Sequence, residues 1–262
     1  MKNRRSRILS ALAATALVAA GLGAPVAQAA KGELVAVAGA TGRTGKHLVE
    51  QLVARGYTVR ALVRDPASAQ GKLPAGVEAV AGDVRDVNQL AAGLKGAKYA
   101  IVSIGASGGP KADAGGTPQD IDNRGVANLA QAAKTAGIAQ LVLVSSSAVT
   151  KAADYPMAFM RPILAAKFEG EQALRASGVP YTIVRPGGLV DEPGGKLAVQ
   201  FAQGDTTTGR IPRADVATAC IEALGRKDAL GRTAEIFSAK DAAPTDWAKA
   251  YAALTADAPV KK

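Results

Sequence analysis

Cysteine, histidine and aromatic residues are scarce in this 262-residue chain. Cys220 is the only cysteine and His47 the only histidine, so neither an intramolecular disulfide nor a Cys/His zinc cluster can form. Aromatic residues make up 4% of the chain and its basic residues are scattered, which argues against a surface that stacks nucleic-acid bases. Because His47 directly follows a glycine-rich turn, we expect an exposed helix residue there, and a Ser-His-Asp hydrolase is disfavoured.

Hydrophobic residues, in contrast, make up 48% of the chain, which is ample for one large core. The segment 1–29 differs from the rest, because basic residues precede the apolar run ILSALAATALVAAGLG. Ala27 and Ala29 provide the small-x-small pattern of a cleavage site. We therefore predict a cleaved signal peptide over 1–29 and an exported protein that starts near Ala30 or Lys31. An uncleaved membrane anchor is the alternative, although the apolar run is short for a membrane span.

The charge balance is basic, with a formal net charge of +10 that falls to +6 without the four cations of the leader. The paired arginines of NRRSRIL are a weak twin-arginine signal, but Arg7 stands where an aromatic is usual, which leaves Sec export equally open. A solvated basic surface would account for the remaining charge. We instead expect the positive charge to bind an anionic small ligand. We expect no binding of nucleic acid, and no membrane span once the signal peptide is cleaved.

Strand-like and helix-like apolar patterns alternate from Leu34 to Val184, as in repeated βαβ units. The predicted strands are 33–38, 57–63, 77–81, 98–104, 139–145 and 180–184. The predicted helices between them are 44–55, 86–94, 120–136 and 160–177. We therefore predict an α/β fold of Rossmann type, with a doubly wound parallel sheet in a single domain over 30–262.

After Pro186 the pattern loosens into a strand near 196–203, a helix over 212–225, a strand at 233–239 and a terminal helix over 243–256. These elements predict a small C-terminal lobe on the substrate side. The stretch 105–120 is rich in glycine, and loops of that length are often lids over active sites.

A glycine motif, G-x-x-G-x-x-G, stands where the first predicted strand turns into the first helix. The first glycine permits a tight turn, the second lets a pyrophosphate approach the backbone, and the third lets the helix pack on the strand. The amides of the helix N-terminus then face the phosphates. A turn without a ligand is the alternative. The cofactor-binding residues expected in this segment are Gly39, Thr41, Gly42, Arg43, Thr44 and Gly45.

The end of the second predicted strand distinguishes NADP from NAD. NAD-binding folds commonly place an acid there for the ribose diol, whereas a 2′-phosphate needs a cation. Arg64 occupies the strand end, and Arg43 projects from the glycine turn. Because two guanidinium groups suit a phosphate, NADP is the predicted cofactor. Asp65 provides the alternative, since a shift of one residue would place its carboxylate at the ribose.

The chain resembles the atypical short-chain dehydrogenase/reductases, in their NAD(P)H-binding, NmrA-like branch. The resemblance rests on AVAGATGRTGKHL, ALVRDP, AGDVRD, VLVSSSAV, AAKFEGEQALRASGVPYTIVRPGGL and IPRADVA, and it spans nearly all of the predicted mature chain. It implies that Asp83 and Val84 lie at the adenine. It further implies that Ser103, Ile104 and Gly105 lie along the nicotinamide side, with Pro186, Gly187 and Gly188 near the nicotinamide amide.

Two of these assignments have structural alternatives. Asp83 could cap the helix that starts near Val87. Gly187 and Gly188 could simply form a turn.

The proton donor of tyrosine-dependent relatives is absent. Those enzymes carry Tyr-x-x-x-Lys, but Ile163 precedes Lys167 by four positions and cannot donate a proton. Lys167 can still hold the nicotinamide ribose, and an exposed surface lysine is the alternative. Ser146 and Ser147 are the other candidate catalytic residues, and Tyr155 is expected to be a packing residue.

The sequence is similar to biliverdin-IXβ and flavin reductases in the glycine turn, in LVRD and in the SSA segment, and those enzymes work without the Tyr-x-x-x-Lys pair. That similarity implies direct hydride transfer to a flavin or quinone that solvent can protonate. Two functions therefore remain open. One is an NADPH-dependent reductase of flavin-like, quinone-like or conjugated small molecules. The other is a noncatalytic NADP-binding protein that senses redox state or helps assemble a protein partner.

Overall fold

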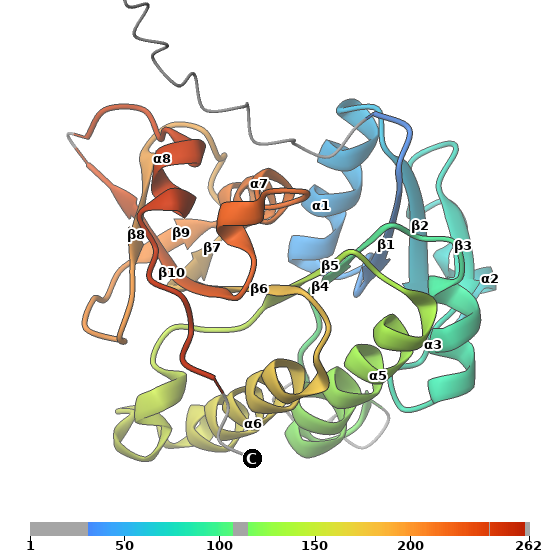
Figure 1. Ribbon diagram of the computed structural model, residues 1–262, viewed down its shortest axis with the longest axis horizontal. Coiled ribbons are helices and arrows are strands. Elements are labelled where there is room, and N and C mark those ends of the chain that lie inside the picture. Colours follow the sequence, from blue (N-terminus) through green and yellow to red (C-terminus); the bar gives the residue numbers. More distant parts are fainter. Residues whose placement is uncertain (1–30, 107–114, 241, 260–262) are drawn as a thin grey trace, which may run out of the picture.

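The computed structural model describes residues 31–106, 115–240 and 242–259 (Figure 1). The predicted signal peptide at 1–29 and half of the predicted loop at 105–120, residues 107–114, lie outside the described residues. Within the described ranges, no helix combines the length and the apolar character that a membrane crossing requires.

A single sheet of eight strands forms the centre of the fold, in the order β3-β2-β1-β4-β5-β6-β10-β8. All neighbouring strands pair in parallel except β10 and β8, which are antiparallel. The strand order reverses between β1 and β4, and ligands of doubly wound folds bind at that point. The strands are β1 (Leu34–Ala38), β2 (Thr58–Val63), β3 (Glu78–Ala81), β4 (Tyr99–Val102), β5 (Gln140–Val144), β6 (Tyr181–Pro186), β8 (Ala198–Ala202) and β10 (Arg232–Ala239).

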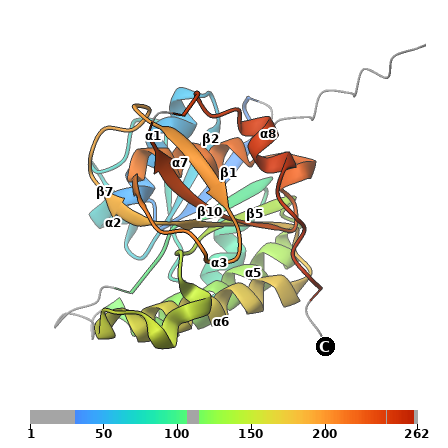
Figure 2. The ribbon, with the colours of Figure 1, turned by 90° about the vertical axis from the view of Figure 1, so that its left-hand side faces the viewer.

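Helices cover both faces of the sheet (Figures 1 and 2). Figure 2 shows α6 on the opposite side of the sheet from α1 and α7. Strand β1 illustrates why both faces need cover, because Val35 and Val37 belong to one hydrophobic core and Ala36 and Ala38 to the other. The helices are α1 (Arg43–Ala54), α2 (Pro66–Ala69), α3 (Val87–Leu94), α5 (Val126–Ala136), α6 (Arg161–Ser177), α7 (Arg213–Glu222) and α8 (Trp247–Ala252).

The fold confirms the predicted doubly wound sheet, and the six strands expected in the first part of the chain occur within one or two residues of their predicted ends. The predicted C-terminal lobe is less separate than expected, since β10 joins the main sheet beside β6 and β8 forms its edge. A small second sheet pairs β7 (Gly188–Val190) with β9 (Arg210–Pro212). The helix predicted over 120–136 begins as a π-helix at Gln119–Gly125 before α5.

Candidate functional site: a nucleotide groove with a buried lysine

The glycine loop adopts a conformation that only glycine fits. Gly39 follows β1 with φ of +82°, and a Cβ atom there would lie 2.1 Å from the Ser103 carbonyl oxygen. A Cβ atom on Gly45 would lie 1.9 Å from the Gly39 carbonyl oxygen. The loop therefore packs directly against the end of β4 and against the start of α1, as the glycine pattern predicts.

The N-terminus of α1 is open to an anion. Its N-cap, Gly42, has no side chain to satisfy the amides of the first turn, and that turn contains no acidic residue. Helices α3 and α8 instead begin with the aspartate caps Asp86 and Asp246. Because the free amides and the helix dipole both favour negative charge, the geometry fits the phosphates of a dinucleotide.

A groove of about 230 Å³ runs from this loop across the switch point between β1 and β4. It brings together nine of the residues predicted for the cofactor. These are Gly39, Thr41, Gly42, Arg64, Asp83, Val84, Ser103, Ile104 and Gly105. Among the other predicted residues, Thr44 and Gly45 are buried in the first turn of α1. Lys167 contacts the groove through the Ile104 carbonyl.

A second cavity, of about 310 Å³, adjoins the groove and is rich in cations. Arg64 and Lys72 line it and make no ion pair with any residue that the structure describes. Arg85 also lines it, and its guanidinium hydrogen bonds to Asp83 at 2.6 and 2.9 Å. These hydrogen bonds hold the pKa of Asp83 below its ordinary value. The cavity therefore offers a ligand two cations that form no ion pair among the described residues, with Asp65 as the one unpaired acid beside them.

Two aspartates, Asp65 and Asp83, line this cavity and have different local roles. Asp83 does not cap the following helix, because Asp86 accepts the amides of Asn88 and Gln89. Asp65 caps α2 by accepting the Ala67 amide at 3.0 Å. One oxygen of Asp65 is thus already used within its own loop.

Arg43 does not join Arg64 at the basic cavity. Its exposed guanidinium pairs with Asp191, which also accepts a hydrogen bond from Arg213 at 2.7 Å. The structure therefore does not bring together the two arginines that we predicted would share the 2′-phosphate. Lys72 and Arg85 lie there instead. In the sequence, the only indication of this role is that Lys72 follows β2 and Arg85 follows β3.

Lys167 is mostly buried and paired, so the alternative of an exposed surface lysine is wrong. Its Nζ atom lies 2.7 Å from Oδ1 of Asp122, with 16% of the lysine side chain and none of the aspartate side chain exposed. Nζ also donates to the Ile104 carbonyl at 3.3 Å, and the Ala106 amide donates to Asp122 Oδ2 at 2.9 Å. The pair therefore fixes the backbone that leaves β4 at the edge of the groove.

Close helix packing makes this pairing possible. Asp122 lies in the π-helix, a feature that is frequent at functional sites. A Cβ atom on Gly170 of α6 would lie 2.1 Å from the Asp122 carbonyl oxygen. Glycine at position 170 therefore lets the two helices approach, and Asp122 can reach Lys167 one turn earlier on α6. The sequence did not single out Asp122, because its partner is far along the chain.

Ser146 and Ser147 follow β5 and are half-buried. The Ser147 amide donates to the Pro186 carbonyl at 2.9 Å, which joins the ends of β5 and β6. The turn continues through Ala148, a non-glycine residue with φ of +65°, whose amide donates to Asp205 at 2.7 Å. Asp205 thus holds the turn that carries both serines, a role that sequence reasoning missed.

Asp205 belongs to a buried charged cluster beside β6. Arg185 donates two hydrogen bonds to Glu171, at 2.6 and 2.9 Å, and its guanidinium lies 3.6 Å from both Asp205 and Glu235. Burial raises the pKa of Glu235. Burial would also raise the pKa of Asp205, but hydrogen bonds from Thr150, the Ala148 amide and the Arg185 charge hold it below its ordinary value.

Gly187 connects β6 to the small second sheet. Its amide donates to the Ile236 carbonyl at 3.0 Å. A Cβ atom there would lie 2.5 Å from the Gly209 carbonyl oxygen and 2.6 Å from the Phe237 ring. The glycine is therefore required for packing, and neither Pro186 nor Gly187 lines the described groove.

Ile163 lies in the first turn of α6 and Tyr155 lies in the segment before that helix, and both are half-buried. The Tyr155 carbonyl accepts a hydrogen bond from Arg161 at 2.8 Å. At the position of the missing tyrosine the chain thus presents an aliphatic side chain, as the sequence indicates.

Comparison with known proteins agrees with this geometry. Residues 39–227 match the NAD(P)H-binding family. The chain belongs to that family. The match confirms the resemblance to atypical, NmrA-like short-chain dehydrogenase/reductases that the sequence motifs indicate, and NAD(P)H is the family's ligand.

Relatives and solved structures extend the match along the chain. An uncharacterized chloroplastic protein of Arabidopsis thaliana is 34% identical over 236 residues, covering 86% of this chain and 84% of the relative. Sanguinarine reductase of Eschscholzia californica is also 34% identical, over 76% of this chain and 86% of its own length. The structure of the oxidoreductase ylbE of Lactococcus lactis aligns with a TM-score of 0.69 at 23% identity, over 83% of this chain and 94% of that one, and shows the shared fold.

Proposed function

We propose that this protein is an NADPH-dependent reductase that passes hydride to a flavin-like, quinone-like or conjugated small molecule. The observation that carries the proposal is the groove at the switch between β1 and β4, where the glycine loop, Arg64 and Ile104 meet. The residues fit a dinucleotide, because the loop excludes side chains and the start of α1 is uncapped. The 34% identity to sanguinarine reductase supports reductase chemistry.

We further propose a preference for NADPH over NADH. Arg64 and Lys72 leave two positive charges unpaired among the described residues at the basic cavity, and a 2′-phosphate would neutralise them. The Arg85 guanidinium is already paired with Asp83, so it contributes less net charge. NADPH, when bound, supplies the hydride.

Lys167 is proposed to position the cofactor rather than to donate a proton. Its ammonium group is held between Asp122 and the Ile104 carbonyl, at the edge of the groove. Ser146 and Ser147 are the hydroxyl groups proposed at the reacting end, where they could hydrogen bond to the acceptor. Protonation of a reduced flavin or quinone can then come from solvent, which is why a side chain such as Ile163 is compatible with turnover.

A noncatalytic NADP-binding role is the second candidate. Ile163 favours it, because an aliphatic residue replaces the proton donor of tyrosine-dependent relatives. In that case a protein partner would respond to the bound nucleotide.

Export through the predicted signal peptide remains part of the proposal. Its support is the order of basic residues, apolar run and small residues in 1–29. Since NADP is expected to be scarce outside the cytosol, twin-arginine export of a folded, loaded protein is the route that fits an NADPH-dependent enzyme.

The test has two steps. The purified protein is first analysed for the nucleotide that accompanies it, and NADP(H) is the expected result. NADPH oxidation is then measured against flavins, quinones, conjugated carbonyls and simple ketones. Turnover with the first three groups and none with ketones would support the reductase, whereas binding without any turnover would favour the second candidate.

A further inference from the structure

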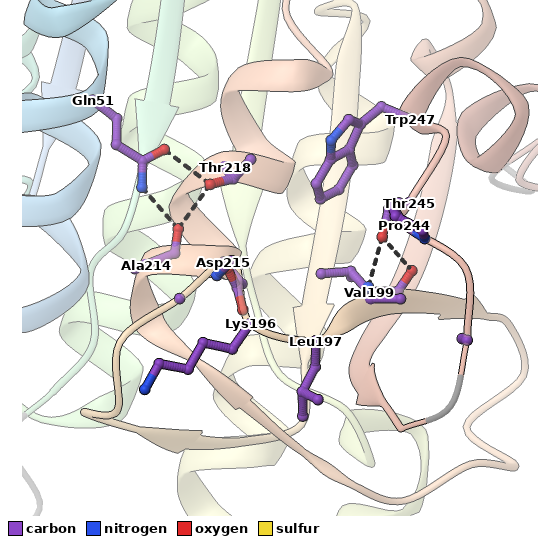
Figure 3. Close-up of a pocket in the computed structure, with 14 residues that line it drawn as sticks. Gln51, Lys196, Leu197, Val199, Ala214, Asp215, Thr218, Pro244, Thr245 and Trp247 are labelled. Atoms are coloured by element: carbon purple, nitrogen blue, oxygen red, sulfur yellow. Dashed lines mark hydrogen bonds between the residues drawn. The ribbon is translucent and has the colours of Figure 1, made fainter.

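A large cavity that does not belong to the cofactor groove lies between α1, α7, α8 and the segment 194–199 (Figure 3). Its volume is about 560 Å³, and it shares no lining residue with the groove or with the basic cavity. The side chains that matter for its chemistry are Gln51, Leu197, Val199, Asp215, Thr218 and Trp247.

One wall of the cavity is a fixed aromatic ring. Trp247 begins α8, and its indole packs edge-on against Phe201 of β8 with 6.2 Å between ring centroids. The Val199 amide donates to the Thr245 hydroxyl at 2.6 Å, so the chain before α8 is tied to β8. The indole is therefore held in place as a flat apolar surface.

Gln51, Thr218 and Thr245 are polar residues of the cavity that already have partners. The Gln51 amide nitrogen donates to the Ala214 carbonyl at 2.9 Å, and the Thr218 hydroxyl donates to the Gln51 amide oxygen at 3.0 Å (Figure 3). Asp215 differs from them. Its Oδ1 atom accepts the Gly195 amide at 2.7 Å, but its Oδ2 atom is buried and has no hydrogen-bond partner among the described residues.

Asp215 forms no ion pair with any residue that the structure describes, and its place in the first turn of α7 favours the charged form. The residue is 6% exposed, and burial raises the pKa of its carboxyl. Lys196 lines the same cavity, but Figure 3 shows its ammonium group directed away, and no ion pair joins it to Asp215 within the described part of the chain. A buried acceptor without a donor is costly, so a donor supplied by a ligand would be stabilised there.

We propose that this cavity binds a small amine, with its ammonium group at the Asp215 carboxylate and its apolar body against Trp247 and Leu197. A charged donor forms the stronger hydrogen bond to a carboxylate, and the apolar body is stabilised by contact with the indole. Gly194 makes the site possible, since a Cβ atom there would lie 2.5 Å from Asp215 Oδ1. The site is separate from the nucleotide groove and does not depend on reductase activity.

The chain contains a single tryptophan, so the fluorescence of Trp247 reports directly on this cavity. Phenethylamine, phenylethanol and phenylpropionate are titrated in turn, in the presence of saturating NADP⁺, which keeps the groove filled and does not absorb tryptophan emission. The three probes share a phenyl body and differ in charge. A saturable change that is tightest for phenethylamine, weaker for phenylethanol and weakest for phenylpropionate is expected. Equal affinities, the reverse order or no saturation would overturn the proposal.

Asp215→Asn is the matched variant, because the asparagine oxygen can still accept the Gly195 amide while the charge is removed. Phenethylamine affinity should fall about tenfold, the loss expected for one charged hydrogen bond, and phenylethanol affinity should stay the same. An unchanged preference for the amine would refute the assignment. The order of affinities for the three probes is measured in the unmodified protein. That order therefore tests the proposed amine site even if Asp215→Asn lowers the stability of the protein.

Discussion

Lys167 and Asp122 form a buried ion pair, 2.7 Å between Nζ and Oδ1, that joins α6 to the π-helix beside the groove. The same lysine donates to the Ile104 carbonyl, and the same aspartate accepts the Ala106 amide. The pair therefore holds the chain that leaves β4 from two directions. In this protein the lysine of the altered Tyr-x-x-x-Lys position is a structural support for the cofactor groove.

Replacing Lys167 by alanine should impair cofactor binding more than chemistry. The change leaves the Asp122 carboxylate buried without its cation and frees the Ile104 backbone, so the KM for NADPH should rise more than kcat falls. Steady-state kinetics with a quinone acceptor measures both. Asp122→Asn serves as the comparison, because it removes the charge but can still accept the Ala106 amide, and it should have a smaller effect of the same kind. A pure loss of kcat in Lys167→Ala would instead assign the lysine to the chemical step.

Arg64→Ala should weaken NADPH binding by about 1.5–3 kcal/mol, the range for a hydrogen bond to a charged group, and leave NADH binding nearly unchanged. Titration calorimetry with the two nucleotides measures this difference. Arg43→Ala is the matched control, since Arg43 already pairs with Asp191 away from the basic cavity. It should change the discrimination between the nucleotides less than Arg64→Ala does. Equal losses of NADPH and NADH affinity in Arg64→Ala would contradict the assignment.

Two glycine substitutions separate backbone strain from steric conflict. Gly39 and Gly71 both have positive φ, but a Cβ atom on Gly39 would lie 2.1 Å from the Ser103 carbonyl oxygen, whereas nothing lies within 4 Å of one on Gly71. Gly71→Ala should therefore cost about 1 kcal/mol of unfolding free energy, and Gly39→Ala more than about 3 kcal/mol. Urea denaturation of both variants measures the two costs. Similar costs would mean that the loop can move away from β4.

Asp205→Asn should lower the free energy of unfolding by about 1–3 kcal/mol at neutral pH. The reason is that Arg185 and the amide and hydroxyl of Thr150 lose a charged acceptor. The folded-state pKa of Asp205 is lowered, so its contribution is present above the unfolded-state pKa and is lost as pH falls through the folded-state value. The stability difference between the unmodified protein and Asp205→Asn should therefore shrink in acid. Denaturation curves at neutral and acidic pH provide the measurement, and a difference that grows in acid would reverse the assigned sign.

The sequence predicted those features whose determinants are local. The alternating patterns located each main strand, and the glycine spacing located the loop, because both depend on residues close together in the chain. The second sheet was missed because β7 and β9 have three residues each, too few for any period to appear.

The missed site residues share a different cause. Asp122 is defined by Lys167, and Asp205 by the Ala148 amide and Arg185, all of them distant in sequence. Asp215 likewise stood in an ordinary helical pattern, and only its burial beside an aromatic wall distinguishes it. Partners that are brought together by the sheet leave no spacing signal along the chain.

The central claim, an NADPH-dependent reductase without a tyrosine proton donor, is tested most directly by the loss of nicotinamide absorbance when the purified protein is mixed with NADPH and a quinone or flavin. We predict that the turnover rate with NADPH exceeds the rate with NADH and falls in Arg64→Ala. The variant Ile163→Tyr should reduce the same acceptors as the unmodified protein. Saturable NADPH binding with no oxidation by any flavin, quinone or conjugated carbonyl would contradict that claim.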